Sequence, residues 1–129
     1  MKPLQRILHA EDDQDIQFLL KMTFETFSDF TYICCDNGEE LLQTLPSFQP
    51  DMILLDMMMP KMNGLETLAC IKANPHTQHI PVIFLTAKIQ PEEVSDYELR
   101  GAFAILFKPF ELSELPTKLE RLWQRYHTL

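Results

Sequence analysis

The chain reads DMILLDMMMPKMNG at residues 51–64, where an apolar run is followed by a segment that contains a proline and ends in a glycine. A short apolar run bounded by turn residues is typical of a strand buried on both faces. The run ends on Asp56, and a buried carboxylate without a partner costs free energy. The stretch therefore predicts a buried strand, and it requires that Asp56 be either exposed or compensated by another group.

The same alternation continues toward both ends of the chain. Short apolar runs predict strands at residues 6–10, 31–35, 51–56, 81–87 and 102–107. Apolar residues at helical spacing predict helices at residues 15–27, 38–45, 64–74, 91–100 and 111–126, with the start of the last one left open by Pro116. Strands that alternate with helices predict an α/β fold, a parallel sheet covered by helices on both faces.

Length and composition exclude several classes of protein. A chain of 129 residues with 46% hydrophobic and 23% charged residues fits one globular domain. No apolar run approaches the roughly 18 residues of a membrane span, and no signal peptide is recognisable, so we expect a cytoplasmic protein without membrane contact. A net charge of -8 argues against a nucleic-acid surface. Three cysteines without C-x-x-C spacing predict neither a disulfide framework nor a zinc site.

Polar residues follow four of the predicted strands at their carboxyl ends. In an open α/β sheet this edge forms the ligand-binding crevice. Alone, a strand-end aspartate is most often a helix cap or turn residue. A ligand-binding site is indicated when several such groups share one edge, and here the groups are an acidic run, a further acid, a hydroxyl and a cation. The residues are Glu11, Asp12 and Asp13 after the first strand, Asp56 at the end of the third, Thr86 near the end of the fourth and Lys108 directly after the fifth.

Electrostatics narrows the chemistry of such a site. Two carboxylates about 4 Å apart repel by about 4 kcal/mol at an effective dielectric of about 20, so a cluster should bind a proton or a cation. Oxygen ligands favour Mg²⁺ or Mn²⁺ over zinc. Magnesium prefers to share a phosphate, and an aspartate beside it, with a Lys and a Thr, has the parts of a phosphoryl-accepting nucleophile.

Four segments together resemble the receiver domain of two-component response regulators, over residues 5–126. They are ILHAEDDQDI at 7–16, LLDMMMPKMNG at 54–64, IPVIFLTAK at 80–88 and GAFAILFKPF at 101–110. The resemblance implies a flavodoxin-like, doubly wound sheet of strand order 2-1-3-4-5 with five helices. It also implies that residues 1–129 form a single receiver domain.

The resemblance implies a metal site built from three acidic side chains and one carbonyl. Asp56 would be the phosphorylated residue, Asp12 a direct ligand of Mg²⁺ or Mn²⁺, and Glu11 the holder of a metal-bound water. The backbone carbonyl of Met58 would be a further ligand. The register has an alternative, in which Asp12 and Asp13 are the acidic pair; in the preferred register Asp13 faces away.

The remaining family positions concern the phosphoryl group and its readout. Thr86 and Lys108 would contact the phosphoryl group, Ala87 would leave room for it, and the Lys108–Pro109 bond would be cis. The family commonly has Tyr or Phe three residues before the lysine, and here Ile105 stands there. DNA-binding relatives dimerise through the fourth helix, fifth strand and fifth helix by charged pairs, which the apolar fifth strand lacks.

The function implied is phosphorylation-dependent signalling rather than turnover of a substrate. A histidine kinase or histidine phosphotransfer protein would phosphorylate Asp56, and the chain, expected to be a monomer without a DNA-binding output domain, would signal by binding another protein. It would catalyse only its own phosphorylation and dephosphorylation.

Two alternative functions are disfavoured by particular residues. A haloacid-dehalogenase-type phosphatase needs a second acid where Met58 stands, which argues against that class of enzyme. An interaction module that has lost phosphorylation is disfavoured by the complete set of acidic, Thr and Lys positions.

Overall fold

Strands and helices alternate through the whole chain, in the order that the sequence predicts. The structure, a computed structural model, describes residues 2–87, 89–108 and 111–129. The strands are β1 (Arg6–Ala10), β2 (Thr31–Cys35), β3 (Met52–Leu55), β4 (Val82–Ala87) and β5 (Ala104–Lys108). The helices are α1 (Gln14–Phe27), α2 (Gly38–Phe48), α3 (Gly64–Ala73), α4 (Pro91–Leu99) and α5 (Leu115–His127), and a 3-10 turn at Leu112–Glu114 precedes α5.

The five strands form one parallel sheet in the order β2-β1-β3-β4-β5, which confirms the predicted flavodoxin-like topology. The order of the chain reverses at β1, so the crevice at the carboxyl ends lies beside β1 and β3. Ala10 pairs with both Cys35 and Leu55. The residues that follow these three therefore emerge at one edge of the sheet.

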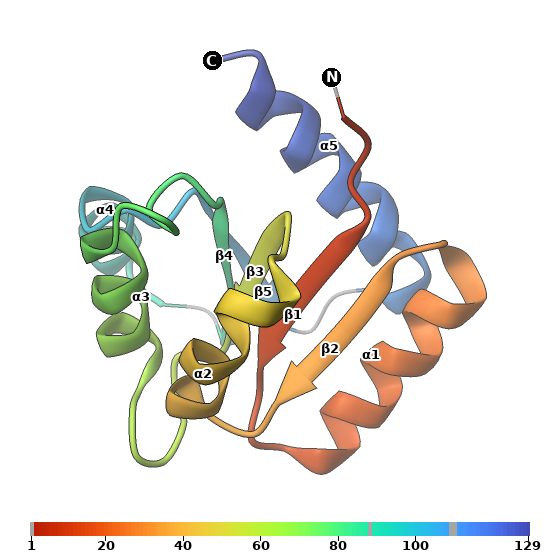
Figure 1. Ribbon diagram of the computed structural model, residues 1–129, viewed down its shortest axis with the longest axis horizontal. Helices are drawn as coiled ribbons and strands as arrows, with labels where there is room; N and C mark the ends of the chain where they lie inside the picture. The colour runs from red at the N-terminus through yellow and green to blue at the C-terminus, as the bar shows by residue number, and fades with distance from the viewer. Residues whose placement is uncertain (1, 88, 109–110) are drawn as a thin grey trace.

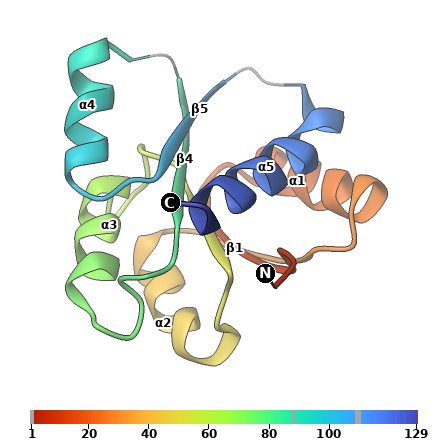
Figure 2. The ribbon, with the colours of Figure 1, turned by 90° about the horizontal axis from the view of Figure 1, so that it is seen from above.

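Helices cover both faces of the sheet, as Figure 1 shows from the side and Figure 2 from above. The helices α1 and α5 lie on one face, and α2, α3 and α4 lie on the other. Each layer encloses its own apolar cluster: residues such as Leu8, Ile53 and Phe84 face α2–α4. Residues such as Ile7, Leu54 and Leu85 face α1 and α5. Successive side chains of each strand thus point to opposite faces of the sheet and pack against different helices, as the pleat of a strand requires.

Two helix boundaries differ from the sequence prediction. The second helix continues beyond Leu45, through Pro46, to the buried Phe48, and ends where Gln49 takes a left-handed conformation with φ 51°. Burial of Phe48 outweighs the backbone hydrogen bond that proline lacks in this last turn. The last helix begins at Leu115 because Pro116 fits the first turn, where an N–H group would have no helical partner.

In the part of the chain that the structure describes, no helix is both long and apolar enough to cross a membrane.

Candidate functional site

Three carboxylates meet at the carboxyl edge of β1 and β3. Glu11, Asp12 and Asp56 each offer an oxygen, and these oxygens lie within 4.8 Å of one another. Backbone hydrogen bonds fix two of the three positions: the Asp56 N–H donates to the Ala10 carbonyl at 3.1 Å, and the Glu11 N–H donates to the Cys35 carbonyl at 2.9 Å. Glu11 and Asp56 are buried, with 1% and 9% of their surface exposed, while Asp12 is exposed.

Lys108, at the end of β5, reaches across this edge to two of the carboxylates. Its Nζ lies 3.4 Å from Oε1 of Glu11 and 3.7 Å from Oδ2 of Asp56. Its side chain is 27% exposed, so the ammonium group is only partly hydrated. The single positive charge offsets part of the repulsion among the three acids. This contact answers the requirement set by the sequence, since Asp56 is buried beside a cation.

Burial is the main cause of an unusual titration at Glu11. Burial, together with the nearby Asp56 charge, raises the pKa of this carboxyl, the Asp13 backbone N–H and the Lys108 charge oppose the shift, and the net result is a pKa raised from 4.5 to about 7. The Asp13 N–H donates to Oε2 of Glu11 at 3.1 Å. Near neutral pH the cluster therefore exchanges a proton, and a cation that entered would compete with that proton.

Asp13 turns away from the cluster and caps α1. Its Oδ1 accepts hydrogen bonds from the backbone N–H groups of Asp15 at 2.9 Å and Ile16 at 3.3 Å. An aspartate at this position stabilises the first turn of a helix by satisfying N–H groups that have no helical partner. The structure thus brings Glu11 and Asp12 to Asp56, and it gives Asp13 a different local task.

The loop from β3 to α3 carries the three methionines. Met57 and Met59 are partly buried and pack against the core beneath α2–α4, whereas 77% of Met58 is exposed. The Gly64 N–H donates to the Met57 carbonyl at 3.0 Å and closes the loop. A Cβ atom at Gly64 would lie 2.6 Å from the carbonyl oxygen of Asp56, so only glycine permits this approach.

Thr86 lies near the end of β4, opposite Phe107 of β5, and is 5% exposed. Among the described residues, the Thr86 hydroxyl has no hydrogen-bond partner that would hold it away from the edge of the sheet. Ala87 follows it and is exposed. The expected cis bond between Lys108 and Pro109 lies outside the described residues.

The donor set fits a hard divalent cation. All ligand atoms that the cluster offers are carboxylate oxygens, which is the chemistry that Mg²⁺ and Mn²⁺ prefer. A buried Glu11 with a raised pKa is also the mark of a carboxylate that lacks a full set of compensating charges. Lysine and threonine at the same edge add a cation and a hydroxyl donor suited to phosphoryl oxygens.

The sequence profile described as "Response regulator receiver domain" matches residues 7–120. The chain belongs to this family of two-component response regulators. It is similar to the transcriptional regulatory protein CpxR of Escherichia coli, with 38% identity over 125 residues, 96% of this chain and 51% of CpxR.

The chain is also similar to part of a larger protein and to a solved structure. A probable cyclic di-GMP phosphodiesterase of Vibrio cholerae is 45% identical over 84 residues, 64% of this chain and 19% of that protein. A putative response regulator from Chloroflexus aurantiacus superposes with a TM-score of 0.84 at 26% identity, covering 96% of this chain and 100% of that one. The chain spans about half or less of the curated relatives, 51% of CpxR and 19% of the phosphodiesterase.

Two polar residues beside the receiver's site escaped the sequence analysis. His9 is fully buried in β1; its Nδ1 lies 2.6 Å from the Tyr32 hydroxyl, and its Nε2 is buried without a partner among the described residues. Burial, and then Lys108, lower its pKa to about 3, so the ring is neutral. Gln17 links the loops after β1 and β2, since its Nε2 donates to the Glu11 carbonyl and to Asp36. The sequence does contain a sign of a buried polar group at His9, because this residue stands inside the apolar run of residues 6–10.

Proposed function

We propose that this receiver accepts a phosphoryl group on Asp56 in a reaction that depends on Mg²⁺ or Mn²⁺. The observation that carries the proposal is the meeting of Glu11, Asp12 and Asp56 within 4.8 Å, with the Lys108 ammonium against two of them. One carboxylate of the three must be available as a nucleophile. Asp56 suits this role because the Lys108 ammonium lies 3.7 Å from its Oδ2 and 12% of its side chain is still exposed.

The transfer from a phosphohistidine donor is a balanced exchange of one bond. An oxygen of the Asp56 carboxylate attacks phosphorus, and the bond from phosphorus to the donor's imidazole nitrogen breaks with its electron pair remaining on that nitrogen. The product is an aspartyl phosphate and a neutral histidine once the nitrogen has taken a proton from water. Lys108 and Thr86 supply a positive charge and a hydroxyl donor for the three phosphoryl oxygens.

The metal would be held by Asp12, Asp56 and the Met58 carbonyl, with Glu11 orienting a coordinated water. When bound, it would draw negative charge from the phosphoryl oxygens and offset the repulsion between donor and acceptor. Glu11 suits the role of a water holder because it is the most buried of the three acids, at 1% exposure, and its Oε1 already faces Lys108. Met58 suits a backbone role because its side chain points into solvent.

The partners follow from this chemistry. The donor is a histidine kinase or a histidine phosphotransfer protein, and the chain acts with them in the cytoplasm, where ATP feeds the kinase. The receiver catalyses its own phosphorylation and dephosphorylation, and it signals through the protein that binds its phosphorylated form. Residues 1–129 act as one receiver domain in this scheme.

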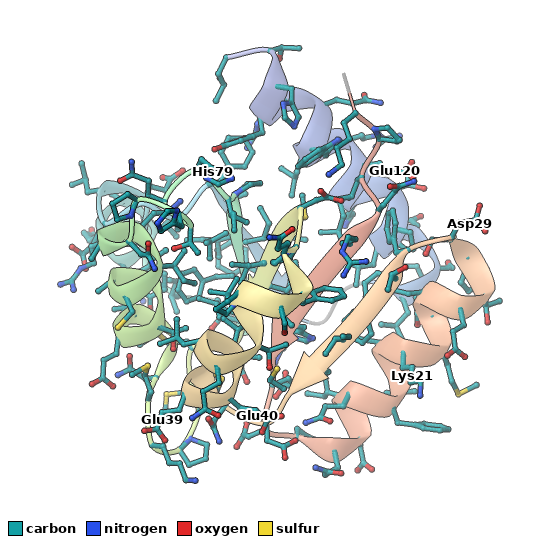
Figure 3. All side chains as sticks on the ribbon, in the orientation of Figure 1. Lys21, Asp29, Glu39, Glu40, His79 and Glu120 are labelled. Carbon is teal, nitrogen blue, oxygen red and sulfur yellow. The ribbon has the colours of Figure 1, made fainter. Side chains whose placement is uncertain are left out.

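Labelling by acetyl phosphate tests the proposal directly. With Mg²⁺ present, intact mass spectrometry should show one added phosphoryl group on the wild type and none on Asp56→Asn. Asp29→Asn is the matched control, because Asp29 is an exposed aspartate at the opposite end of the sheet, labelled in Figure 3. Undiminished labelling of Asp56→Asn, or of the wild type in EDTA, would contradict the assignment.

A further inference from the structure

A cleft opens at the amino ends of the strands, at the edge of the sheet opposite the three acids. It is formed by residues from 45–51, 74–81 and 123–127 together with Lys2, and Asp51 directly precedes β3. This edge is at the top of Figure 1, where the two ends of the chain lie. The volume of the cleft is about 770 Å³, compared with about 410 Å³ for a cavity between α1 and β2. Sites for small molecules typically measure about 300–1,000 Å³.

The inner wall of the cleft is apolar and aromatic. Leu45 and Ile80 are buried, and so is the Trp123 ring. The Trp123 indole N–H donates to the Lys2 carbonyl at 2.8 Å, which holds the ring in place. The His127 ring stands edge-on to the indole, with the centroids 4.1 Å apart and the ring planes at 75°. A flat ring that entered the cleft would therefore meet aliphatic carbon and aromatic rings.

Three of the chain's four histidines line this one cleft. His76 and His79 come from the connection between α3 and β4, and His127 comes from α5. All three residues are exposed, and His79 is labelled in Figure 3. A neutral imidazole donates one N–H, and a protonated imidazole donates two and is positively charged. The histidines thus place hydrogen-bond donors around an apolar wall.

The cleft has little free negative charge, although the net charge of the protein is -8. Among the lining residues that the structure describes, Asp51 is the only acid. Its carboxylate lies 2.7 Å from Nζ of Lys2 and also accepts the backbone N–H groups of Gln5 and Arg6. The charges of Asp51 and Lys2 therefore offset each other. A negatively charged ligand would meet imidazole donors here without an unpaired carboxylate to repel it.

The walls of the cleft are tied to one another before any ligand binds. The Tyr126 hydroxyl donates to the His79 carbonyl and joins α5 to the connection between α3 and β4. Within that connection, the Lys72 ammonium donates to the carbonyls of Gln78 and Ile80, each at 3.0 Å. A preformed site spares a ligand the entropy of ordering loops.

Two other classes of ligand fit the cleft less well. Three histidines suggest a transition metal, but among the described residues only Glu11, Asp12 and Asp56 bring three ligand groups within 4.8 Å of one another. A multiply charged phosphate ester needs several fixed positive charges, whereas the cleft has one lysine, which is already paired. An anion of single charge with an apolar body matches both the wall and the histidines.

We propose that this cleft binds a small aromatic carboxylate. The ring of the ligand would lie against the wall of Leu45, Ile80 and Trp123, and its carboxylate would accept hydrogen bonds from the imidazoles. Burial of the ring supplies affinity, and the imidazoles favour an anion over an uncharged molecule of the same shape. The cleft lies at the opposite edge of the sheet from Asp56, so binding does not require phosphorylation.

Protein-observed NMR on the complete chain, with two matched probes, tests the site. The probe 2-naphthoate carries a carboxylate, and 2-naphthamide has the same rings and nearly the same shape without a charge. The chain has one tryptophan, so the indole N–H of Trp123 gives a single signal in a ¹H–¹⁵N spectrum. Titration with 2-naphthoate should shift this signal and the amide signals of residues 74–80 until they saturate. The amide probe should bind about tenfold more weakly, because it lacks the charge-assisted hydrogen bonds.

Two variants separate the cleft from other apolar surfaces. With His76→Gln, His79→Gln and His127→Gln combined, 2-naphthoate should bind no more tightly than 2-naphthamide, while the melting temperature should stay close to that of the wild type because all three side chains are exposed. The matched control is Phe18→Ala, because Phe18 lines the cavity between α1 and β2 and is 64% exposed. Both titrations should be unchanged in this control.

The possible outcomes distinguish this site from the proposed function. Asp56→Asn should bind 2-naphthoate as the wild type does, so a failure of phosphorylation leaves the cleft untouched. Equal affinity of the wild type for both probes, or a preference for 2-naphthoate that survives in the triple histidine variant, overturns the selection of an anion by the imidazoles. Shifts confined to α1 and β2, or a Trp123 indole signal that does not respond, overturn the site itself.

Discussion

At the scale of single residues, the three consecutive acids at 11–13 differ in what their side chains contact. Asp12 faces Asp56, whereas Asp13 caps α1. We expect Mg²⁺ to raise the melting temperature, because binding to the folded state stabilises it by RT ln(1 + [L]/Kd), about 2.7 kcal/mol at a hundredfold excess over Kd. Asp12→Ala should remove most of this rise. Asp13→Ala should keep it while lowering the metal-free stability by about 1 kcal/mol, the usual cost of a lost cap.

Differential scanning fluorimetry over a series of Mg²⁺ concentrations measures both effects at once. The comparison uses the shift within each variant, so the loss of the cap in Asp13→Ala does not obscure the result. A Mg²⁺ shift that persists in Asp12→Ala and disappears in Asp13→Ala would move the metal site by one residue along the chain.

Most of the site's residues could be predicted because their types are unusual where they stand. A carboxylate that ends an apolar run, as Asp56 does, conflicts with burial unless a partner compensates it, and this conflict is visible in the letters alone. The contact of Lys108 with both Glu11 and Asp56 could not be predicted from the residue types in this way. It depends on how far β5 lies from β1 across the sheet, and no local pattern specifies that distance.

At the scale of elements, the start of β1 is fixed by an aspartate from the connection between α2 and β3. Oδ2 of Asp51 accepts the backbone N–H groups of Gln5 at 3.0 Å and Arg6 at 2.8 Å, and Oδ1 lies 2.7 Å from Nζ of Lys2. Burial alone would raise the pKa of Asp51, but these hydrogen bonds and the Lys2 charge outweigh it, so the pKa is lowered from 3.8.

The lowered pKa fixes the sign of a pH effect on stability. The contribution of Asp51 is complete above the unfolded-state value near 3.8 and is lost as the pH falls through the lower folded-state pKa. We expect Asp51→Asn to cost about 1–3 kcal/mol in urea unfolding at pH 7, the usual cost of leaving buried groups unpaired. The difference from the wild type should shrink at pH values below the unfolded-state pKa.

Asp29→Asn serves as the control, since Asp29 is an exposed carboxylate near the start of β2 and points away from the fold in Figure 3. It should change stability by less than about 0.5 kcal/mol. If Asp51→Asn were as stable as Asp29→Asn at neutral pH, the hydrogen bonds to Gln5 and Arg6 would not stabilise the start of β1.

The boundaries of helices are the feature that the local sequence pattern predicts least well in this chain. The apolar spacing predicts that the second helix ends at Leu45, yet the helix runs on through Pro46 to Phe48. Phe48 is 6% exposed, and its ring lies 4.2 Å from the Arg6 guanidinium, a residue more than forty positions away. A tertiary contact of this kind decides the boundary, and propensity cannot register it.

At the scale of the whole molecule, the alternation of strand and helix allowed the topology to be predicted. Parallel strands need crossovers, and the resemblance supplied the order that places β1 beside β3. The attachment of α4 could not be predicted in the same way. Its residues 91–99 resemble the other amphipathic segments in the sequence, but in the fold only Tyr97 is buried. Which helix is loosely held depends on neighbours that the spacing does not reveal.

The oligomeric state of the activated receiver is also a property of the whole surface. We expect phosphorylation to leave the chain monomeric. The strand β5 carries no charge from Ala104 to Phe107, so it offers no charged pair to a second copy. On α5, the Arg125 guanidinium lies 4.9 Å from the Phe103 ring centroid, which engages this cation within the chain. A net charge of -8 adds repulsion between copies.

Sedimentation velocity with Mg²⁺, with and without beryllofluoride, measures the state over a series of protein concentrations. The sedimentation coefficient should remain that of a monomer in both conditions, while Asp56→Asn controls for effects of the reagents on the solvent. Moderate salt should be present in all samples, because screening of the net charge removes repulsion as a trivial reason for a monomer. A dimer that forms only with beryllofluoride would contradict the prediction. It would show that a chain with Ile105 on β5 can still assemble on activation, and that the apolar β5 surface, with Phe107 39% exposed, replaces charged pairs as the contact.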